Sequence, residues 1–419
     1  MHNSFKLKSN QLFKNIGETW ESMKYKYFII VIACATVLVA IFALHSFYNR
    51  QSTEQSKNII WSKTFGGPGD EEGWFVKETG DKLLALGYTC SFTTYENNSD
   101  IWLICLDSNG VELWNKTYGS FADDYGKCIV KTEDGGYIIA GNTYSYGKEN
   151  SDVYIIKIDE NGTEKWEKAI GGIDYDAATF VLENHNQTLV LGNTYSYGKE
   201  NNGDIWLICL DSNGTELWSK TYGGAKYDDA RCIRETPDGG YIIAGETESY
   251  GKGLLDIWVL KTDSNGTELW NKTYGGLRDD ICNDIIKTSD GKYLISGHTQ
   301  SFSNSWDAWV IYIDPNGTEL WNKTYGGKKD DGASSIIEIN STQYILTGYT
   351  KTYGRGQGDL WIIKISSNGT ELWNKTYGGK KDDSGIWLEK TKDGCYVAIG
   401  YTSSYGKGQS DIWILKIRG

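Results

Sequence analysis

The sequence contains little proline, histidine or methionine. Its 419 residues include 3 Pro, 4 His and 2 Met, against 50 Gly, 17 Trp and 29 Tyr. Hydrophobic residues make up 39% of the chain, which is enough to form a core and argues against intrinsic disorder. Abundant Gly and aromatic residues with scarce Pro are typical of many short strands joined by tight turns.

Basic residues are outnumbered by acidic ones. The chain carries 42 Lys and Arg against 55 Asp and Glu, a formal net charge of −13. Proteins that bind nucleic-acid backbones depend on clustered Lys and Arg. We therefore expect no nucleic-acid partner.

The eight Cys residues contain no C-x-x-C motif, so their spacing supports neither a zinc site nor a thioredoxin-like site. Cys105 and Cys209 occupy equivalent positions in two copies of a repeat, as do Cys128 and Cys232. Equivalent positions in separate copies lie too far apart for a disulfide. We expect these residues to act as small buried hydrophobic side chains.

Residues 27–48 (YFIIVIACATVLVAIFALHSFY) form a run of 22 residues without a charge, which is long enough to cross a bilayer as a helix. Five Lys residues precede it, and few cations follow it. The positive-inside rule then predicts a cytoplasmic basic segment at 1–26, a single-pass signal-anchor helix at 27–48, a linker at 49–57 and an extracellular domain at 58–419. A cleaved signal peptide is the alternative, although no small-x-small site follows the run.

A near-identical phrase recurs along the rest of the chain. Its Trp falls at seven positions spaced by 51 to 53 residues: Trp61, Trp114, Trp166, Trp218, Trp270, Trp321 and Trp373. Repeats with such a period indicate a repeat architecture. One unit, residues 228–274, reads as four strands joined by turns such as P-D-G-G and S-N-G-T, and Asp-Gly and Asn-Gly between apolar runs favour hairpins.

The third strand of each unit is apolar on both faces, as in Ile205–Leu210, so each sheet needs cover on both sides. Sheets arranged face to face around an axis provide that cover. The first phrase, 58–66, is a fourth strand without a preceding three, and the last unit ends on a third strand. We therefore predict an all-β, seven-bladed β-propeller of four-stranded antiparallel blades, closed by the N-terminal strand and preceded by one transmembrane helix. The predicted blades are 70–118, 123–170, 174–222, 228–274, 279–325, 330–377 and 382–417 plus strand 58–66.

Residues 58–419 resemble the tandem propeller repeats of prokaryotic, especially archaeal, cell-surface proteins. The shared pattern is W-x-K-T-Y-G-G-x-x-x-D-D … D-G-G-Y-I-I-A-G-x-T … D-I-W-L-I-K. The stretch LDSNGTELW is loosely similar to the tryptophan-docking hairpin of quinoprotein-like propellers, which usually have eight blades. The resemblance implies an exported propeller and does not imply catalysis.

In such a propeller the connections between fourth and first strands and between second and third strands share one rim, here called the upper rim. Each second strand ends in Gly-x-Thr, and the residue x varies within a fixed frame, as ligand-binding residues on a scaffold do. Trp306 has no counterpart in the other loops. The candidate ligand-binding residues are Tyr88, Asn142, Asn193, Glu246, His298, Trp306, Tyr349 and Tyr401. The alternative is that the varying positions are ordinary rim residues.

The upper rim also carries an acidic ring and a ring of S-Y-G-K loops. Clustered carboxylates such as Asp228, Asp229, Asp279 and Asp280 are weak candidates for Ca²⁺, but one Asp in every blade is more typical of turn capping. We therefore expect no metal and no cofactor. The Tyr of each S-Y-G-K loop either stacks on a ligand or folds onto its own blade to order the loop.

Twelve N-x-S/T sequons follow the apolar run. In an exported chain the Asn-Gly-Thr copies at Asn161, Asn213, Asn265, Asn316 and Asn368 are candidate glycosylation sites. The same tripeptide is also good turn chemistry, and the sequence does not separate the two roles.

Neither a G-x-S-x-G nor an H-E-x-x-H motif occurs, and the Gly-Gly pairs end strands rather than open helices. Glu246 and an Asp of the upper rim could form a carboxylate pair of the kind that glycosidases use. In a chain with so many acidic residues, however, such a pair is weak evidence for catalysis. The sequence favours a non-catalytic binding or adhesion module for a cell-surface protein or carbohydrate. A structural cell-envelope element is the alternative, and a carbohydrate-active or quinoprotein-like enzyme is a less favoured one.

Overall fold

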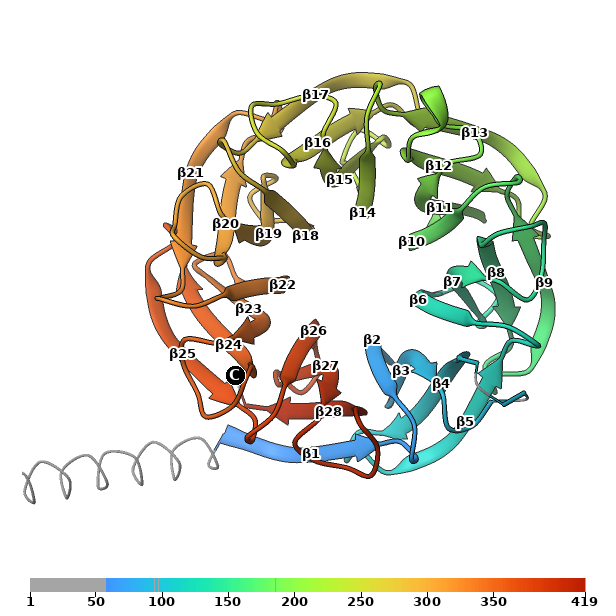
Figure 1. Ribbon diagram of the computed structural model, residues 1–419, viewed down its shortest axis with the longest axis horizontal. Helices are drawn as coiled ribbons and strands as arrows, with labels where there is room; N and C mark the ends of the chain where they lie inside the picture. Colours follow the sequence, from blue (N-terminus) through green and yellow to red (C-terminus); the bar gives the residue numbers. More distant parts are fainter. Residues whose placement is uncertain (1–57, 94, 97, 185, 419) are drawn as a thin grey trace, which may run out of the picture. The chain divides into compact units, whose positions relative to one another are not determined.

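The computed structural model describes residues 58–418, apart from residues 94, 97 and 185. Their strands form seven four-stranded antiparallel sheets arranged around a central axis (Figure 1). This confirms the predicted seven-bladed β-propeller. The predicted anchor at 27–48, with the flanking segments 1–26 and 49–57, lies outside the described residues. No helix in the described part of the chain is long and apolar enough to span a bilayer.

The strands are grouped here by their position in a blade, from the axis outwards. The first strands, next to the axis, are β2 (Glu71–Thr79), β6 (Asp124–Lys131), β10 (Asp176–Asn184), β14 (Asp228–Glu235), β18 (Asp280–Lys287), β22 (Asp331–Asn340) and β26 (Asp383–Lys390). The second strands are β3 (Lys82–Thr89), β7 (Tyr137–Thr143), β11 (Gln187–Thr194), β15 (Tyr241–Thr247), β19 (Tyr293–Thr299), β23 (Gln343–Thr350) and β27 (Tyr396–Thr402).

The third strands are β4 (Asp100–Asp107), β8 (Asp152–Ile158), β12 (Asp204–Leu210), β16 (Asp256–Thr262), β20 (Asp307–Ile313), β24 (Asp359–Ser366) and β28 (Asp411–Ile417). The outer, fourth strands are β5 (Glu112–Tyr118), β9 (Glu164–Ile170), β13 (Glu216–Tyr222), β17 (Glu268–Tyr274), β21 (Glu319–Tyr325), β25 (Glu371–Tyr377) and β1 (Ile59–Phe65). A short 3₁₀ helix, η1 (Lys199–Asn201), lies in the loop before β12.

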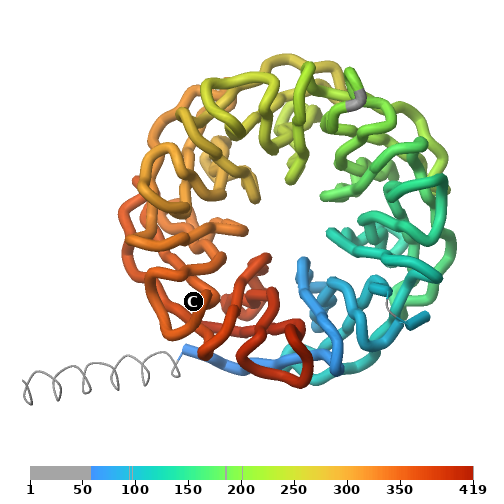
Figure 2. The backbone as a smooth tube through the Cα atoms, viewed as in Figure 1, coloured from blue at the N-terminus to red at the C-terminus, as the bar shows by residue number. Residues whose placement is uncertain are grey.

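The chain closes the ring with its own first strand. β1 pairs antiparallel with β28, so that Ser62 lies opposite Leu415 and Thr64 opposite Trp413. The backbone trace shows β1, in blue, lying beside the red strands of the last blade (Figure 2). The indole of Trp413 also donates to Ser62 Oγ at 2.8 Å. The seventh blade is therefore completed by a strand from the other end of the propeller sequence, as the sequence predicts.

In six of the seven joints, the recurring Trp of a fourth strand packs on the third-to-fourth turn of the next blade. A Cβ added to Gly162 would lie 2.8 Å from the Trp114 ring, and one added to Gly266 would lie 2.8 Å from Trp218. These glycines have positive φ values of 77° and 75°, which the Asn-Gly turn favours. The close approach of ring to backbone explains why the turn and the Trp recur together.

A Tyr at the end of the same strands fixes this joint with a hydrogen bond. The hydroxyls of Tyr118, Tyr222, Tyr274 and Tyr325 donate to the carbonyls of Gly162, Gly266, Gly317 and Gly369 at 2.5 to 2.7 Å. No hairpin joins β28 to β1, so the last joint lacks this turn. The buried hydroxyl of Tyr377, at the equivalent position, has no hydrogen-bond partner among the described residues.

Each joint is held at the upper rim by a buried acidic side chain at the start of the first strand. Asp280, for example, accepts hydrogen bonds from Gly276 N at 2.8 Å and Ser301 Oγ at 2.7 Å, and also from the Thr299 hydroxyl. The equivalent residues are Glu71, Asp124, Asp176, Asp228, Asp280, Asp331 and Asp383, all at most 1% exposed. These carboxylates cap the turns, so the ring that they form is structural.

A second Asp, from the third strand of the preceding blade, faces each of these carboxylates across a glycine, and it is buried in six of the seven joints. A Cβ on Gly275 would lie 1.8 Å from Asp256 Oδ1 and 2.6 Å from Asp280 Oδ2. Burial raises the pKa of Asp280, and the neighbouring Asp256 raises it further. Burial likewise raises the pKa of Asp204, with a further rise from Asp228. Six of the seven upper joints therefore pair two carboxyl groups away from water.

We predict that Tyr325→Phe and Tyr377→Phe have different effects on stability. Tyr325→Phe removes a buried hydrogen bond, which contributes about 1 kcal/mol. Tyr377→Phe removes a hydroxyl without a partner and should leave the free energy of unfolding unchanged or raise it. Urea unfolding of both variants measures the difference, and equal losses would contradict the assignment of an open joint between blades 6 and 7.

We also predict that the propeller loses stability as the pH rises above the ordinary aspartate pKa of 3.8. Asp204 and Asp280 have folded-state pKa values above their ordinary value of 3.8, so they stabilise the fold below that value and lose this contribution as the pH rises through the folded-state pKa. Aspartates with lowered pKa values, such as Asp134 beside Lys157, act in the opposite sense but only below about pH 4. Urea midpoints at several pH values test the trend, and Asp204→Asn, which cannot ionise, should reduce the slope. Urea midpoints that do not change with pH would contradict the prediction, because they would show that ionisation of the paired carboxyl groups does not lower the free energy of unfolding.

Candidate functional site: the upper rim and the central cup

A β-bulge interrupts every first strand at the same position. The register between first and second strands shifts around one residue in each blade, as around Lys127 in β6 and Arg231 in β14. The seven bulge residues are Trp74, Lys127, Thr179, Arg231, Asn283, Ser334 and Ile386. A bulge re-aims side chains, and here all seven line one cavity on the axis.

The glycine of each Gly-x-Thr segment lets the first strand bulge. A Cβ on Gly245 would lie 1.9 Å from the carbonyl oxygen of Asp229, and one on Gly141 would lie 1.8 Å from that of Tyr125. No side chain fits so close to a neighbouring backbone. The glycine of the second strand therefore helps to fix the position of the bulge residue on the first.

The cavity has a volume of about 280 Å³ and is closed beneath the bulge residues by aromatic rings. Phe75 stacks on Trp387 with ring centroids 4.4 Å apart, and Phe180 lies 6.0 Å from Trp387. These rings come from blades 1, 3 and 7 and meet across the axis, so the channel is filled at their level. Each of them follows the bulge residue on a strand that runs away from the upper rim. The cavity is thus a cup that opens at the upper rim, and we call it the central cup.

A buried ion pair supports the floor of the central cup. Arg234 from β14 lies with its guanidinium carbon 4.7 Å from the centre of the Phe180 ring, and its Nη2 is 2.6 Å from Asp284 Oδ1. Asp284 is 1% exposed and also accepts from Ser335 Oγ at 3.1 Å and Ile336 N at 3.2 Å. Burial raises the pKa of Asp284 and Arg234 opposes that rise. The floor is therefore a fixed part of the scaffold.

Arg231 presents a cation to the cup with its counterions behind it. Its Nε lies 3.0 Å from Glu246 Oε1 and its Nη2 lies 3.1 Å from Asp229 Oδ2. The Arg231 side chain is 40% exposed, whereas those of Asp229 and Glu246 are 6% and 1% exposed. Burial raises the pKa of Glu246, and the neighbouring Arg231 opposes this. A ligand in the cup would meet the guanidinium rather than the carboxylates.

Lys127 is the second cation of the cup wall. Its Nζ lies 2.9 Å from the centre of the Trp74 ring, and the Trp74 indole donates to Glu72 Oε2 at 3.0 Å. Burial lowers the pKa of Lys127 to about 7, although Glu72 partly offsets this. The lysine therefore changes charge near neutral pH.

Five of the eight predicted ligand residues lie partly exposed at the mouth of the cup: Tyr88, His298, Trp306, Tyr349 and Tyr401. The His298 ring packs against Trp306 with centroids 4.7 Å apart and lies 6.4 Å from Tyr349. Tyr88 contacts Trp74 at 5.4 Å between centroids. Burial lowers the pKa of His298 to about 4, so this ring is neutral at physiological pH. We call these five residues the aromatic crescent.

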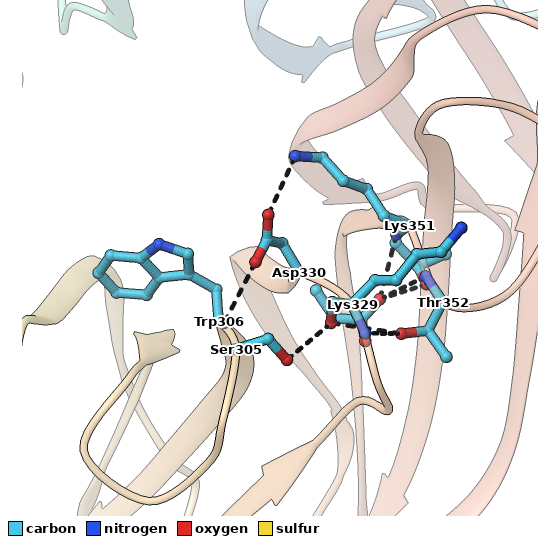
Figure 3. Close-up of polar contacts among 8 residues, drawn as sticks. Ser305, Trp306, Lys329, Asp330, Lys351 and Thr352 are labelled. Atoms are coloured by element: carbon cyan, nitrogen blue, oxygen red, sulfur yellow. Dashed lines mark hydrogen bonds and ion pairs between the residues drawn. The ribbon is translucent and has the colours of Figure 1, made fainter.

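The next blade holds the Trp306 loop in place. Trp306 N lies 3.4 Å from Asp330 Oδ1, and Lys351 Nζ lies 3.2 Å from Asp330 Oδ2. Ser305 Oγ donates to Lys329 O at 3.1 Å. Figure 3 shows the indole of Trp306 extending away from this network. The loop is thus ordered by its neighbour while its large side chain points elsewhere.

The other three predicted residues are buried and bonded within the scaffold. Asn142 donates to Ser151 Oγ at 3.1 Å, Asn193 accepts from Ala230 N at 2.7 Å, and Glu246 holds Arg231. They are 4%, 8% and 1% exposed. At these positions the varying residue of Gly-x-Thr supports the site from behind instead of facing solvent.

The weak metal candidates are also occupied by protein contacts. Asp228 and Asp280 cap joints, Asp229 pairs with Arg231, and Asp279 Oδ1 accepts from Leu255 N at 3.2 Å. Within the described residues, no group of three or more His, Cys, Asp or Glu side chains is arranged to hold a metal ion.

The Tyr of most S-Y-G-K-type loops folds onto its own blade. Tyr250 lies 5.1 Å from Trp258 and donates to Gly223 O of the preceding blade at 3.0 Å. Tyr353 and Tyr405 make the same pair of contacts. Of the two roles that the sequence left open for this Tyr, the structure shows the second, in which the ring packs on its own blade and orders the loop.

The bulge residues are the part of the site that the repeat pattern missed. Their signal was present, because each follows the acidic D-D segment at a constant spacing while its identity changes from Trp to Lys, Thr, Arg, Asn, Ser and Ile. That is the same fixed-frame variation that pointed to the Gly-x-Thr residue.

No protein-family model matches the chain. The regulatory protein FlaEY of Caulobacter vibrioides is 25% identical over 367 residues, which is 77% of this chain but 37% of that protein. The chain thus spans little more than a third of this relative.

Solved structures show the same fold at low sequence identity. The WD40 β-propeller domain of Doa1 superposes with a TM-score of 0.52 and 11% identity over 86% of this chain and 96% of that chain. Drosophila Plexin A, in complex with Semaphorin 1b, superposes with a TM-score of 0.51 and 7% identity over 86% of this chain and 87% of that chain. At these identities the likeness establishes the β-propeller fold alone.

Proposed function

We propose that the chain is a membrane-anchored, extracellular binding or adhesion module that captures a cell-surface protein or carbohydrate through the aromatic crescent without catalysis. The observation that carries this proposal is the Trp306–His298–Tyr349 cluster. Its rings contact one another at 4.7 and 6.4 Å at an open mouth, and the supporting loop is bonded to the next blade. A pre-ordered aromatic surface loses little entropy on binding.

The type of partner follows from the chemistry of the crescent. Tyr and Trp are enriched at protein–protein contacts because each offers a large apolar face with a polar edge. The upper rim also exposes large apolar side chains, with Phe121 64% and Leu277 82% exposed. Plexin A, which shares the fold, is seen in a complex with a protein. A carbohydrate that stacks on the same rings is the second candidate.

The proposed topology rests on residues 1–57. The uncharged run at 27–48 is long enough to span a bilayer, and the Lys-rich residues before it favour a cytoplasmic N-terminus. Since β1 begins at Ile59, only the linker 49–57 would separate the propeller from the proposed anchor. The asparagines of five Asn-Gly-Thr turns on the lower rim are exposed, which suits N-linked glycans: Asn161, Asn213, Asn265, Asn316 and Asn368.

Two other functions make different predictions. A structural cell-envelope element would self-associate and bind no separate ligand. An enzyme would need a reactive pair at the mouth, and Glu246 is the residue that the sequence suggested. Glu246 is 1% exposed and bonded to Arg231, which favours a supporting role.

We predict that Trp306→Ala and Tyr401→Ala each weaken binding to isolated cell envelopes by about tenfold or more, because truncated aromatic anchors typically cost 2 kcal/mol or more. The measurement is quantitative capture of the purified full chain on envelopes, followed by protein and glycan arrays. Leu269→Ala is the control, since Leu269 is 55% exposed on the outer strand β17.

Three outcomes would contradict the proposal. Unchanged capture by both aromatic variants would remove the crescent from the binding site. Self-association alone, seen by sedimentation, would support an envelope element. Turnover of an envelope substrate that Glu246→Gln abolishes in a folded protein would support an enzyme.

A further inference from the structure

The central cup is a second site, separate from the partner of the aromatic crescent. We propose that it binds a small carboxylic acid, or the carboxylate end of a larger ligand, with the apolar part of the ligand on the aromatic floor. The inference does not depend on what the crescent binds, because the two sites use different residues.

The polar wall of the cup consists of five side chains with donor groups, of which Asn283 already donates to Ala333 O at 2.8 Å and contacts His298 Nδ1 at 3.2 Å. Lys127, Thr179, Arg231, Asn283 and Ser334 come from five consecutive blades. Carboxylates pair with Arg and Lys through short charge-assisted hydrogen bonds. An anionic head group placed between Lys127 and Arg231 would meet both cations. The Thr179 hydroxyl between them donates to Leu191 O at 3.4 Å and would have to turn from that carbonyl to act as a third donor.

The position of the counterions distinguishes this wall from an ordinary surface ion pair. Glu246 and Asp229 hold Arg231 from the protein side, at 3.0 and 3.1 Å, and are almost fully buried. The 40% of the Arg231 side chain that remains exposed faces the cup. The guanidinium is thus oriented before a ligand arrives, and a pre-oriented donor favours binding of an anion.

The remaining wall and the floor are apolar. Ile386 completes the wall, and Phe75, Phe180 and Trp387 form the floor. The buried Nε1–H of Trp387 has no acceptor among the described residues. A volume of about 280 Å³ suits a small planar acid, and binding pockets usually combine an apolar lining with few polar groups.

Other ligand classes fit the cup less well. A cation would meet Arg231 and Lys127. A sugar needs an open aromatic face in the wall, but the Trp74 ring is covered by Lys127 at 2.9 Å. The open rings lie at the mouth, in the aromatic crescent, so the two sites differ in chemistry.

The charge of Lys127 makes the site sensitive to pH. The groups that act on it are Glu72 on β2, Arg231 and Asp229 on β14, and the rings of Trp74 and Tyr125. Burial holds its pKa at about 7, so the ammonium form decreases as the pH rises above 7. Affinity for an anion should then fall between pH 6 and pH 8 while that for a neutral analogue stays constant.

The test uses the purified full chain and 4-fluorobenzoate, with 4-fluorobenzamide as the neutral analogue of the same shape. Fluorine relaxation measures both affinities at pH 6 and pH 8. We expect the acid to bind at least tenfold more tightly than the amide at pH 6 and to weaken several-fold at pH 8. Lys127→Met should lower the affinity for the acid about tenfold, and Lys328→Met, on an exposed loop, should leave it unchanged.

A second variant covers the case in which Lys127→Met fails to fold. Ile386→Trp leaves every charge in place and fills the cup, so it should abolish binding of the acid. Equal binding of acid and amide, no binding of the acid at millimolar concentration, or full binding by Ile386→Trp would each overturn the proposal. If envelope capture fails while the acid still binds, the result would contradict the function proposed for the aromatic crescent and leave the proposal for the central cup standing.

Discussion

The pairing of β1 with β28 is the constraint on which the rest of the structure depends. Once these two strands pair, seven blades must share one full turn, and every joint must have nearly the same geometry. The repeated Trp, the Asn-Gly turn, the Gly-Gly exit and the buried Asp residues all lie at joints. Their near-identity along the chain follows from closure, because a joint of different shape would prevent β1 from reaching its partner.

Each joint is fixed at two heights by different chemistry. On the lower side an indole packs on a glycine turn in six joints, and in four of them a Tyr hydroxyl donates to that glycine. On the upper side two carboxyl groups face each other across a glycine and accept backbone hydrogen bonds. Dispersion contacts on one side and directional bonds on the other resist both opening and twisting. The lower joint at Tyr377 has no such turn, and the Tyr377 hydroxyl has no hydrogen-bond partner among the described residues.

Much of this architecture could be predicted from the sequence because it depends on periodic signals. The Trp spacing gave the blade count, and the incomplete first and last units gave the closure. The sites were harder because two local rules failed. A strand pattern assumes alternation, and a bulge at Arg231 or Lys127 breaks that alternation by one residue, so the axial residues could not be read from it. Whether the varying residue of Gly-x-Thr is buried or exposed also depends on the neighbouring blade. Asn193 is buried and donates to Asp229 of the next blade, whereas Tyr349 stays partly exposed.

The ring also explains how nearly identical repeats can form an asymmetric site. The residues that must repeat lie at the joints, and the bulge provides one position per blade that lies outside the repeated Trp, Gly and Asp contacts and lines the cavity on the axis. Seven such positions can hold seven different side chains around a small volume, with Trp74 and Ile386 on one side and the donors from Lys127 to Ser334 on the other. Changing one of them alters the cup without changing the angle between blades. On each first strand, therefore, the capping acidic residue keeps the repeat, while the bulge residue three positions later is free to vary for binding.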